Sequence, residues 1–196
     1  MTTKVKVDLC FKITGKNLSV DHGFALYGAI SRILPSIHEA KEVGLKMVRG
    51  RYVGNGLLDI SPQSELVLRI PAEYIRDLLP LAGKSLDVQG HRLNVGIPVT
   101  RALVPAAALF SPLVTTRNGQ DQSRFETEMF SQMGLLGVNG RLSIGKRRTF
   151  GIHGKQVVGY SVLVSELSAE ESIVLQEQGL GGRRKMGCGV FEAWRS

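Results

Sequence analysis

The sequence predicts an α+β protein made of two tandem ferredoxin-like (RRM-like) domains, each with the element order βαββαβ. Three observations support this class. Period-two alternation and helical stripes of apolar residues follow one another in this order twice. Residues 97–108, with two prolines and a run of alanines, separate the two series. The composition, 43% hydrophobic and 21% charged over 196 residues, is that of a globular chain. The predicted domains are residues 1–97 and 108–196.

The first half begins with the clearest strand, Lys4 to Thr14, in which apolar residues occupy every second position. A helix is predicted from about Asp21 to Leu34, because its apolar residues recur at helical spacing and Pro35 cannot continue a regular helix. A second helix starts after Pro71, a favourable first-turn residue, and extends to Gly83. The remaining predicted elements are short strands at 46–53, 57–60, 65–70, 85–88 and 92–95.

The second half repeats the order with a different sequence. It opens with a strand at 109–117, a helix at 124–136 and a long hairpin of strands 142–150 and 156–164. The segment Ser168-Ala-Glu-Glu171 is a capping box that opens a helix through Gln178, and Gly179 ends this helix. A strand at 190–194 completes the second domain.

Charge indicates a polyanionic partner. The 25 Lys and Arg outnumber the 17 Asp and Glu, which gives a net charge of +8. Three clusters hold many of these bases: Lys46/Arg49/Arg51, Lys146-Arg147-Arg148 and Arg183-Arg184-Lys185. The two cysteines lie almost the whole chain apart, which excludes a disulfide framework and a cysteine zinc site. No stretch approaches the roughly 20 apolar residues of a membrane-spanning helix, so we expect a cytoplasmic protein with no membrane partner.

The most specific feature is the glycine-rich segment 179–189, in which five of eleven residues are glycine and three consecutive residues are basic. Glycine allows close approach and positive φ, so the N–H groups of such a loop can cradle phosphate oxygens. Two common nucleotide motifs do not match, because Cys188 stands where a P-loop needs Lys and Arg184 where a dinucleotide fingerprint needs Gly. A nucleotide-dependent enzyme is therefore not expected.

This segment, preceded by a helix and followed by a strand as GLGGRRKMGCGVF, resembles the C-terminal glycine-rich loop of the RAMP superfamily. Within that superfamily the chain resembles the CRISPR-associated endoribonucleases that process precursor crRNA. The resemblance runs through the whole chain. It includes DHGFALYGAISRILP after the first strand, the tandem ferredoxin-like pattern and SAEESIVLQEQGLGGRRKMGCGVF at the end.

The resemblance implies that the protein binds a CRISPR repeat RNA, often a small hairpin, and cuts it once without a metal or any other cofactor. It implies that the 2′-hydroxyl beside the scissile phosphate attacks, leaving a 2′,3′-cyclic phosphate and a 5′-hydroxyl. Many members stay on the mature crRNA hairpin, so other subunits of a CRISPR effector complex are expected partners.

That reaction needs a base for the 2′-hydroxyl and an acid for the leaving oxygen, and histidine serves both roles near neutral pH. His22 is the first choice, because a helix N-terminus disfavours the imidazolium and keeps a neutral base. Tyr27 and His38 stand where subgroups of the family place a catalytic histidine. A regular helix would separate His22 and His38 by roughly 24 Å, so they are alternatives. His91, in a loop, and His153, at a hairpin tip, are expected to be surface residues.

For RNA binding we expect phosphate contacts from the hairpin bases Lys146, Arg147 and Arg148 and from the loop bases Arg183, Arg184 and Lys185. Backbone N–H groups of Gly181, Gly182 and Gly187 are expected to assist, and a bulky residue at Gly182 should harm the loop. Arg49 and Arg51 are weaker candidates. Two alternatives stay open: a non-catalytic crRNA-binding subunit of an effector complex, which would not require His22, and an unrelated ferredoxin-like protein that binds an anionic metabolite.

Overall fold

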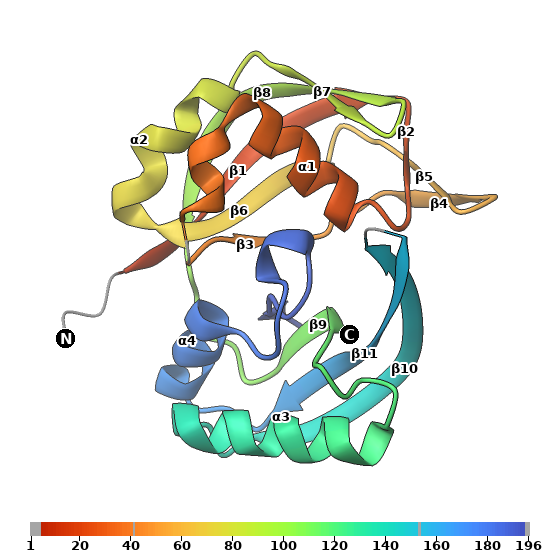
Figure 1. Ribbon diagram of the computed structural model, residues 1–196. Helices are drawn as coiled ribbons and strands as arrows, with labels where there is room; N and C mark the ends of the chain where they lie inside the picture. Colours follow the sequence, from red (N-terminus) through yellow and green to blue (C-terminus); the bar gives the residue numbers. More distant parts are fainter. Residues whose placement is uncertain (1–4, 41, 153, 195–196) are drawn as a thin grey trace. The chain divides into compact units, whose positions relative to one another are not determined.

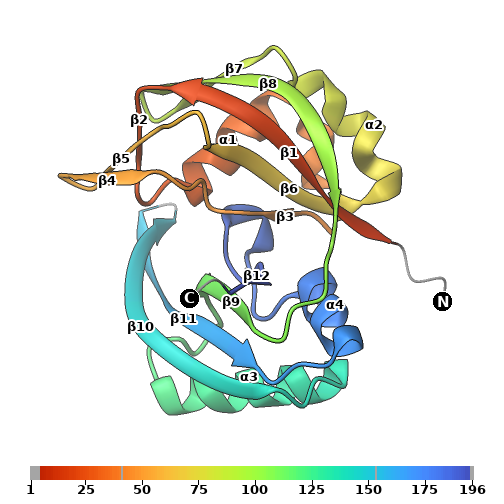
Figure 2. The same cartoon turned by 180° about the vertical axis from the view of Figure 1, so that it is seen from behind.

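The computed structural model describes residues 5–40, 42–152 and 154–194, and the chain divides into two compact units, Met1–Ala102 and Leu103–Ser196. Each unit contains an antiparallel sheet with helices packed on one of its faces (Figures 1 and 2). The predicted α+β class and the tandem βαββαβ order are confirmed. None of the helices in the described part of the chain is long and apolar enough to cross a membrane.

The N-terminal unit is built on a five-stranded sheet of order β3-β6-β1-β8-β7. Within it, the order β3-β6-β1-β8 is that of a ferredoxin-like domain, and β7 adds an edge strand. A separate three-stranded sheet has the order β2-β5-β4. The strands are β1 (Lys6–Gly15), β2 (Asn17–Ser19), β3 (Gly44–Leu45), β4 (Arg51–Gly54), β5 (Leu57–Asp59), β6 (Glu65–Pro71), β7 (Ser85–Val88) and β8 (His91–Ala102).

The first strand and first helix of this unit follow the predicted pattern closely. The alternating residues Leu9, Phe11 and Ile13 of β1 are all less than 3% exposed. Leu26 and Ile30 of α1 (Gly23–Ile33) are fully buried, as the helical stripe predicts. Pro35 then begins a short 3-10 turn, Pro35–His38, which ends the regular helix.

Three elements of the N-terminal unit differ from the prediction. The helix expected after Pro71 is broken into α2 (Ile75–Leu78) between 3-10 turns at Ala72–Tyr74 and Leu79–Leu81. Pro80 lacks an N–H and cannot continue an α-helix, which accounts for the second break. The strand expected at 46–53 is interrupted, and only 44–45 and 51–54 are in strands. The strand expected at 92–95 instead runs over the whole of β8, because β1 pairs with it from Val7↔Ala102 to Gly15↔Leu93.

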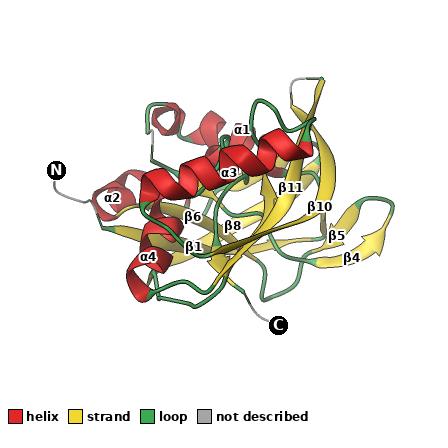
Figure 3. Cartoon of the chain, turned by 90° about the horizontal axis from the view of Figure 1, so that it is seen from below, coloured by secondary structure: helices red, strands yellow, loops and turns green. Residues whose placement is uncertain are grey.

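The C-terminal unit has a four-stranded sheet of order β10-β11-β9-β12, which is again the ferredoxin-like order. Its helix α3, seen lengthwise in Figure 3, buries Phe125, Met129 and Met133 against Tyr160 and other core residues of the sheet. The elements are β9 (Leu109–Val114), α3 (Gln122–Leu136), β10 (Arg141–Ile152), β11 (Lys155–Ser165), α4 (Ala169–Gln178), a 3-10 turn at Arg184–Met186, and β12 (Glu192–Ala193).

The helix ends of the C-terminal unit agree with the local sequence signals. The capping box is complete, because Ser168 Oγ accepts from the Glu171 N–H and the Glu171 carboxylate accepts from the Ser168 N–H. The N–H groups of Ser168 and Asn139, which both donate to the Glu171 carboxylate, hold the pKa of Glu171 below its ordinary value. Gly179 follows the last residue of α4, as predicted. The final strand is shorter than expected, because only Glu192 and Ala193 pair with β9.

Candidate active site and nucleic-acid interface

His22 lies directly before α1, and both of its ring nitrogens are used by the main chain. Its Nε2 accepts a hydrogen bond of 2.9 Å from the N–H of Val48, and its Nδ1 lies 2.6 Å from the carbonyl oxygen of Ser19. Because Nε2 accepts, Nδ1 must carry the proton and donate it to Ser19. The side chain is 1% exposed. This geometry indicates that His22 links the main chain at Ser19 to that at Val48. It argues against the predicted role of His22 as the general base.

Tyr27 and His38, the other two predicted catalytic residues, are brought together. The hydroxyl of Tyr27 lies 3.0 Å from Nδ1 of His38, and the two rings meet edge to face with centroids 5.4 Å apart. Tyr27 projects from α1 and is buried, whereas His38 ends the 3-10 turn and is exposed. The turn that Pro35 begins therefore brings His38 back alongside the preceding helix.

The chemistry of this pair depends on where its protons lie. Burial raises the pKa of the Tyr27 phenol, so its hydroxyl stays protonated at neutral pH. When Nδ1 of His38 donates to the Tyr27 oxygen, Nε2 is the unprotonated nitrogen and can accept a proton. This is the tautomer that a histidine base requires, and the Tyr27 hydroxyl, which can accept as well as donate, is compatible with it.

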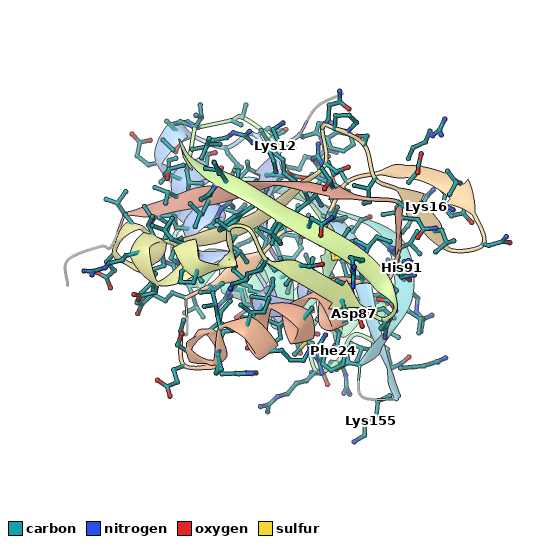
Figure 4. The ribbon with its side chains drawn as sticks, turned by 90° about the horizontal axis from the view of Figure 1, so that it is seen from above. Lys12, Lys16, Phe24, Asp87, His91 and Lys155 are labelled. Atoms are coloured by element: carbon teal, nitrogen blue, oxygen red, sulfur yellow. The ribbon has the colours of Figure 1, made fainter. Side chains whose placement is uncertain are left out.

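The other two histidines of the chain are His91 and His153. His91 was expected in a surface loop, but it begins β8, is half-buried and holds Asn17 Oδ1 at 2.8 Å from its Nδ1. Figure 4 labels it near Asp87, on the other side of the β7–β8 turn. His153 lies outside the described residues. Among residues 5–40, 42–152 and 154–194, no three His, Cys, Asp or Glu side chains gather as metal ligands would.

The glycine-rich segment forms a tight loop in which close backbone contacts require glycine at some positions. A Cβ at Gly189 would lie 1.9 Å from the carbonyl oxygen of Leu180, and a Cβ at Gly181 would lie 2.5 Å from that of Thr115. Both glycines also have positive φ, +66° and +72°. Gly182 differs, because a Cβ there would meet nothing closer than 4.0 Å. The expectation that a larger residue at Gly182 harms the loop is therefore not supported.

The N–H groups expected to cradle phosphates are instead used within the fold. Gly181 donates to Oε1 of Gln132 at 2.7 Å, and Gly182 donates to the carbonyl of Thr115 at 2.9 Å. The N–H of Gly187 is directed at the carbonyl of Arg184, and this glycine is buried. The N–H groups of Gly181 and Gly182 thus hold the loop to α3 and to the residue after β9, and that of Gly187 closes a turn within the loop. These hydrogen bonds argue against the predicted contacts of the three N–H groups with RNA.

The loop still presents positive charge through side chains. Arg183 is exposed and adopts the left-handed conformation with φ +59°. Arg184 and Lys185 are half-buried, and Nη1 of Arg184 lies 3.4 Å from the Gly181 carbonyl. Desolvation lowers the pKa of the Lys185 ammonium. The loop can therefore attract an anionic ligand through the positive charge of its side chains.

The three hairpin bases are all exposed, but they do not form a single patch. A β-bulge lies between Ile144 and Arg147, and the N–H of Lys146 within it donates to Ser161 Oγ. After the bulge Arg147 pairs with the core residue Tyr160, so Arg147 lies on the helix-covered face, near Gln120. Arg148 pairs with Gly159 and lies on the helix-free face.

The basic cluster of the N-terminal unit is also divided. Arg49 and Arg51 are exposed, and Arg51 forms an exposed ion pair of 3.2 Å with Asp59. Lys46 instead lies 2.8 Å from Asp8, whose carboxylate is also held by Arg69. Burial alone would raise the pKa of Asp8, but the hydrogen bonds and charges of Arg69 and Lys46 outweigh it and lower this pKa. Lys46 therefore belongs to a structural ion-pair network.

Sequence reasoning missed the residue that anchors the glycine-rich loop. Gln132 on α3 is half-buried and accepts the Gly181 N–H. It stands directly before Met133, beside the buried stripe of this helix, and a polar residue in that position is the signal that could have identified it.

Comparison with known proteins places the chain in a family. Residues 7–196 match the Cas6 Crispr family. The chain is 41% identical over 187 residues to the CRISPR-associated endonuclease Cas6 of Myxococcus xanthus, covering 95% of this chain and 81% of that protein. Among solved structures, a CRISPR-associated protein Cas6 has a TM-score of 0.67 at 15% identity, covering 97% of this chain and 99% of its own. An RAMP protein binding different RNA substrates has a TM-score of 0.65 at 12% identity, covering 97% and 100%. These structures share the tandem ferredoxin-like fold. The chain therefore belongs to the Cas6 family.

Proposed function

We propose that this protein is a metal-independent endoribonuclease that cleaves CRISPR repeat RNA within precursor crRNA. The relative from Myxococcus xanthus is named a CRISPR-associated endonuclease, and a structural neighbour is described as an RNA-binding RAMP protein. The net charge of +8 suits a polyanionic substrate. The observation that carries the proposal is the hydrogen-bonded pair of Tyr27 and His38.

In this mechanism the nucleophile comes from the RNA itself. Nε2 of His38 takes the proton of the 2′-hydroxyl, and the freed oxygen attacks the adjacent phosphorus. The O2′–P bond forms as the P–O5′ bond breaks, and the leaving 5′-oxygen takes a proton from water. The products carry a 2′,3′-cyclic phosphate and a 5′-hydroxyl. No metal-activated water is needed, because the attacking oxygen is part of the substrate.

Tyr27 is assigned a positioning role. In the proposed tautomer its hydroxyl accepts from Nδ1 of His38, which orients the ring and leaves Nε2 as the proton-accepting nitrogen. His38 is exposed and so can reach a bound phosphodiester. General-base catalysis of this kind contributes about 10² to 10⁴ in rate.

RNA is held chiefly by side-chain charge. Arg183 of the glycine-rich loop and the exposed hairpin bases Arg147 and Arg148 contact phosphates, with Lys146, Arg184 and Lys185 beside them. Arg49 and Arg51 extend the basic surface of the N-terminal unit. A protein with several such contacts releases its product slowly, which suits a subunit that stays on the crRNA hairpin within an effector complex.

The test uses labelled repeat RNA from the host's CRISPR array, incubated with purified protein in excess EDTA. We expect one cut, a cyclic phosphate on the upstream product, and no cut when the scissile nucleotide carries a 2′-deoxyribose. Cleavage of the deoxy substrate, or cleavage that requires added Mg²⁺, would overturn the mechanism. Tight binding without any cut would favour the alternative of a non-catalytic crRNA-binding subunit.

A further inference from the structure

Two aromatic rings lie together on the helix-free face of the C-terminal sheet. Phe110 of β9 and Trp194, directly after β12, have ring centroids 4.9 Å apart and planes inclined by 54°. Ala193 pairs with Leu109, a fully buried core residue, whereas Glu192 pairs with Phe110. Because side chains alternate along a strand, Phe110 and Trp194 point away from the helices.

The pair is partly exposed, and a hydrogen bond fixes the main chain at Trp194. Trp194 is 46% exposed although it is the largest apolar side chain in the chain, and Phe110 is half-buried. The N–H of Trp194 donates to the carbonyl of Ala108 at 2.9 Å, which ties this residue to the start of β9. On the other side of Phe110, Leu163 of β11 lies directly opposite and is also half-buried. The indole therefore lies beside the Phe110 ring, which itself lies opposite the apolar side chain of Leu163.

The same face carries positive charge at a short distance. Arg148 pairs with Gly159, four residues along β11 from Leu163, which corresponds to roughly 13 Å of strand. Nearer the rings, the cross-strand partner of Leu163 on β10 is Ser143. The half-buried Glu192 beside Phe110 disfavours a phosphate at the rings themselves. The arrangement suits a base on the rings and a phosphate at Arg148.

A protein partner fits this surface less well than an RNA base does. The other exposed large apolar residues of this unit include Phe130 and Leu135 on α3, which packs on the opposite face of the sheet. Two adjacent rings bordered by serine and glutamate are small for a protein interface, which buries about 800 Å² on each side. They are large enough for one or two bases, since every base has a π-face that stacks on an aromatic side chain.

We propose that Phe110 and Trp194 form a stacking platform for an unpaired base of the RNA, and that Arg148 binds a phosphate of the same strand. The inference rests on the proposed function in taking RNA as the ligand. It adds a site for single-stranded RNA on the helix-free face of the C-terminal sheet, built from residues of the C-terminal unit, whereas Tyr27 and His38 belong to the N-terminal unit.

The first test needs no substitution, because Trp194 is the single tryptophan of the chain and its fluorescence reports this site alone. The full-length protein is titrated with a short oligoadenylate and, separately, with repeat RNA, while binding is followed in parallel by anisotropy of labelled RNA. We expect the tryptophan emission to be quenched with the same midpoint as the anisotropy change. Unchanged emission at saturating RNA would overturn the proposal.

Variants then separate stacking from charge. Trp194→Ala should weaken oligoadenylate binding by about 5- to 150-fold without changing its salt dependence, and Trp194→Phe should keep most of the affinity. Arg148→Ala should make the slope of log affinity against log salt shallower by about 0.7. The matched control is Phe130→Ala, which removes an exposed ring from α3 and should bind as wild type.

Equal affinity of wild type and Trp194→Ala, or equal losses in Trp194→Ala and Phe130→Ala, would reject the platform. Thermal unfolding of each variant identifies a folding defect. If Trp194→Ala does not fold, the RNA affinity of Trp194→Phe and the tryptophan quenching of the wild type decide whether the platform binds RNA. Cleavage of repeat RNA is measured separately. Cleavage of RNA without any change in Trp194 emission rejects the platform alone. Quenching of the Trp194 emission without cleavage rejects the proposed function alone.

Discussion

The two ends of α1 use histidine in opposite ways. At the N-terminal end, His22 is buried, and both of its ring nitrogens hydrogen-bond to the main chain. Beyond the C-terminal end, His38 is exposed, and its Nδ1 lies beside the hydroxyl of Tyr27. The difference teaches that access and partner, rather than position at a helix terminus, decide which imidazole can move a proton. A ring committed to the backbone stabilises the fold, and a ring oriented by one side chain at the surface can act on a ligand.

The largest effect is expected at His38. His38→Ala should lower the single-turnover rate of repeat cleavage by about 10²- to 10⁴-fold, because it removes the proton acceptor. RNA affinity and the free energy of unfolding should stay near wild type, since the side chain is exposed. Single-turnover cleavage, filter binding and urea unfolding measure the three quantities. A cleavage rate within tenfold of wild type would show that another group, and not His38, is the general base.

At His22 the effect should fall on stability. His22→Ala leaves the buried N–H of Val48 without its acceptor and should lower the free energy of unfolding by about 2–4 kcal/mol. Cleavage per folded molecule should be unchanged. His22→Gln is the matched control, because its amide can still accept a hydrogen bond, and it should lose less. A stable but inactive His22→Ala protein would reverse the assignment of the two histidines.

A smaller effect is expected from Tyr27→Phe, which keeps the ring and removes the hydroxyl beside His38. The cleavage rate should fall by about two- to tenfold, the equivalent of one ordinary hydrogen bond, with RNA affinity unchanged. The pH dependence of the single-turnover rate should also change, because His38 loses the partner that sets its tautomer. An unaltered rate and profile would show that Tyr27 has no positioning role.

The smallest effect concerns stability in alkaline solution. The pKa of the Tyr27 phenol is raised in the folded protein above its ordinary value of 10.0. Its contribution to stability is therefore complete below pH 10 and is lost as the pH rises through the folded-state pKa. Urea unfolding of wild type and Tyr27→Phe above pH 10 should show a smaller loss in the variant. Parallel curves for the two proteins would contradict the raised pKa.

Local sequence signals were sufficient for much of the fold. The alternation in β1, the stripe of α1 and the capping box at Ser168 each depend on residues close together in the chain, and all three are confirmed. The break in the helix after Pro71 and the extension of β8 were missed. The length of β8 depends on its pairing with β1, about ninety residues away in sequence, which local patterns do not record.

Several residues of the candidate site could be identified from the sequence, but most of the contacts between them could not. Tyr27 and His38 were identified as residues, but their contact depends on the turn that follows Pro35. The hydrogen bond of His22 was not foreseen because its partner, Val48, lies 26 residues further along the chain. The hydrogen bonds of the Gly181 and Gly182 N–H groups were missed for the same reason, since their acceptors, Gln132 and Thr115, are distant in sequence. Non-local hydrogen bonds are thus the information that spacing alone lacks.

The most direct test of the central claim is imidazole rescue of the His38→Ala protein, measured as single-turnover cleavage of repeat RNA in excess EDTA. Because His38 is exposed, added imidazole can reach the space that the substitution creates. If His38 is the general base, we expect almost no cleavage without imidazole and a rate that rises with imidazole concentration at an unchanged cut site. A His38→Ala protein that cleaves at the wild-type rate without imidazole would contradict it.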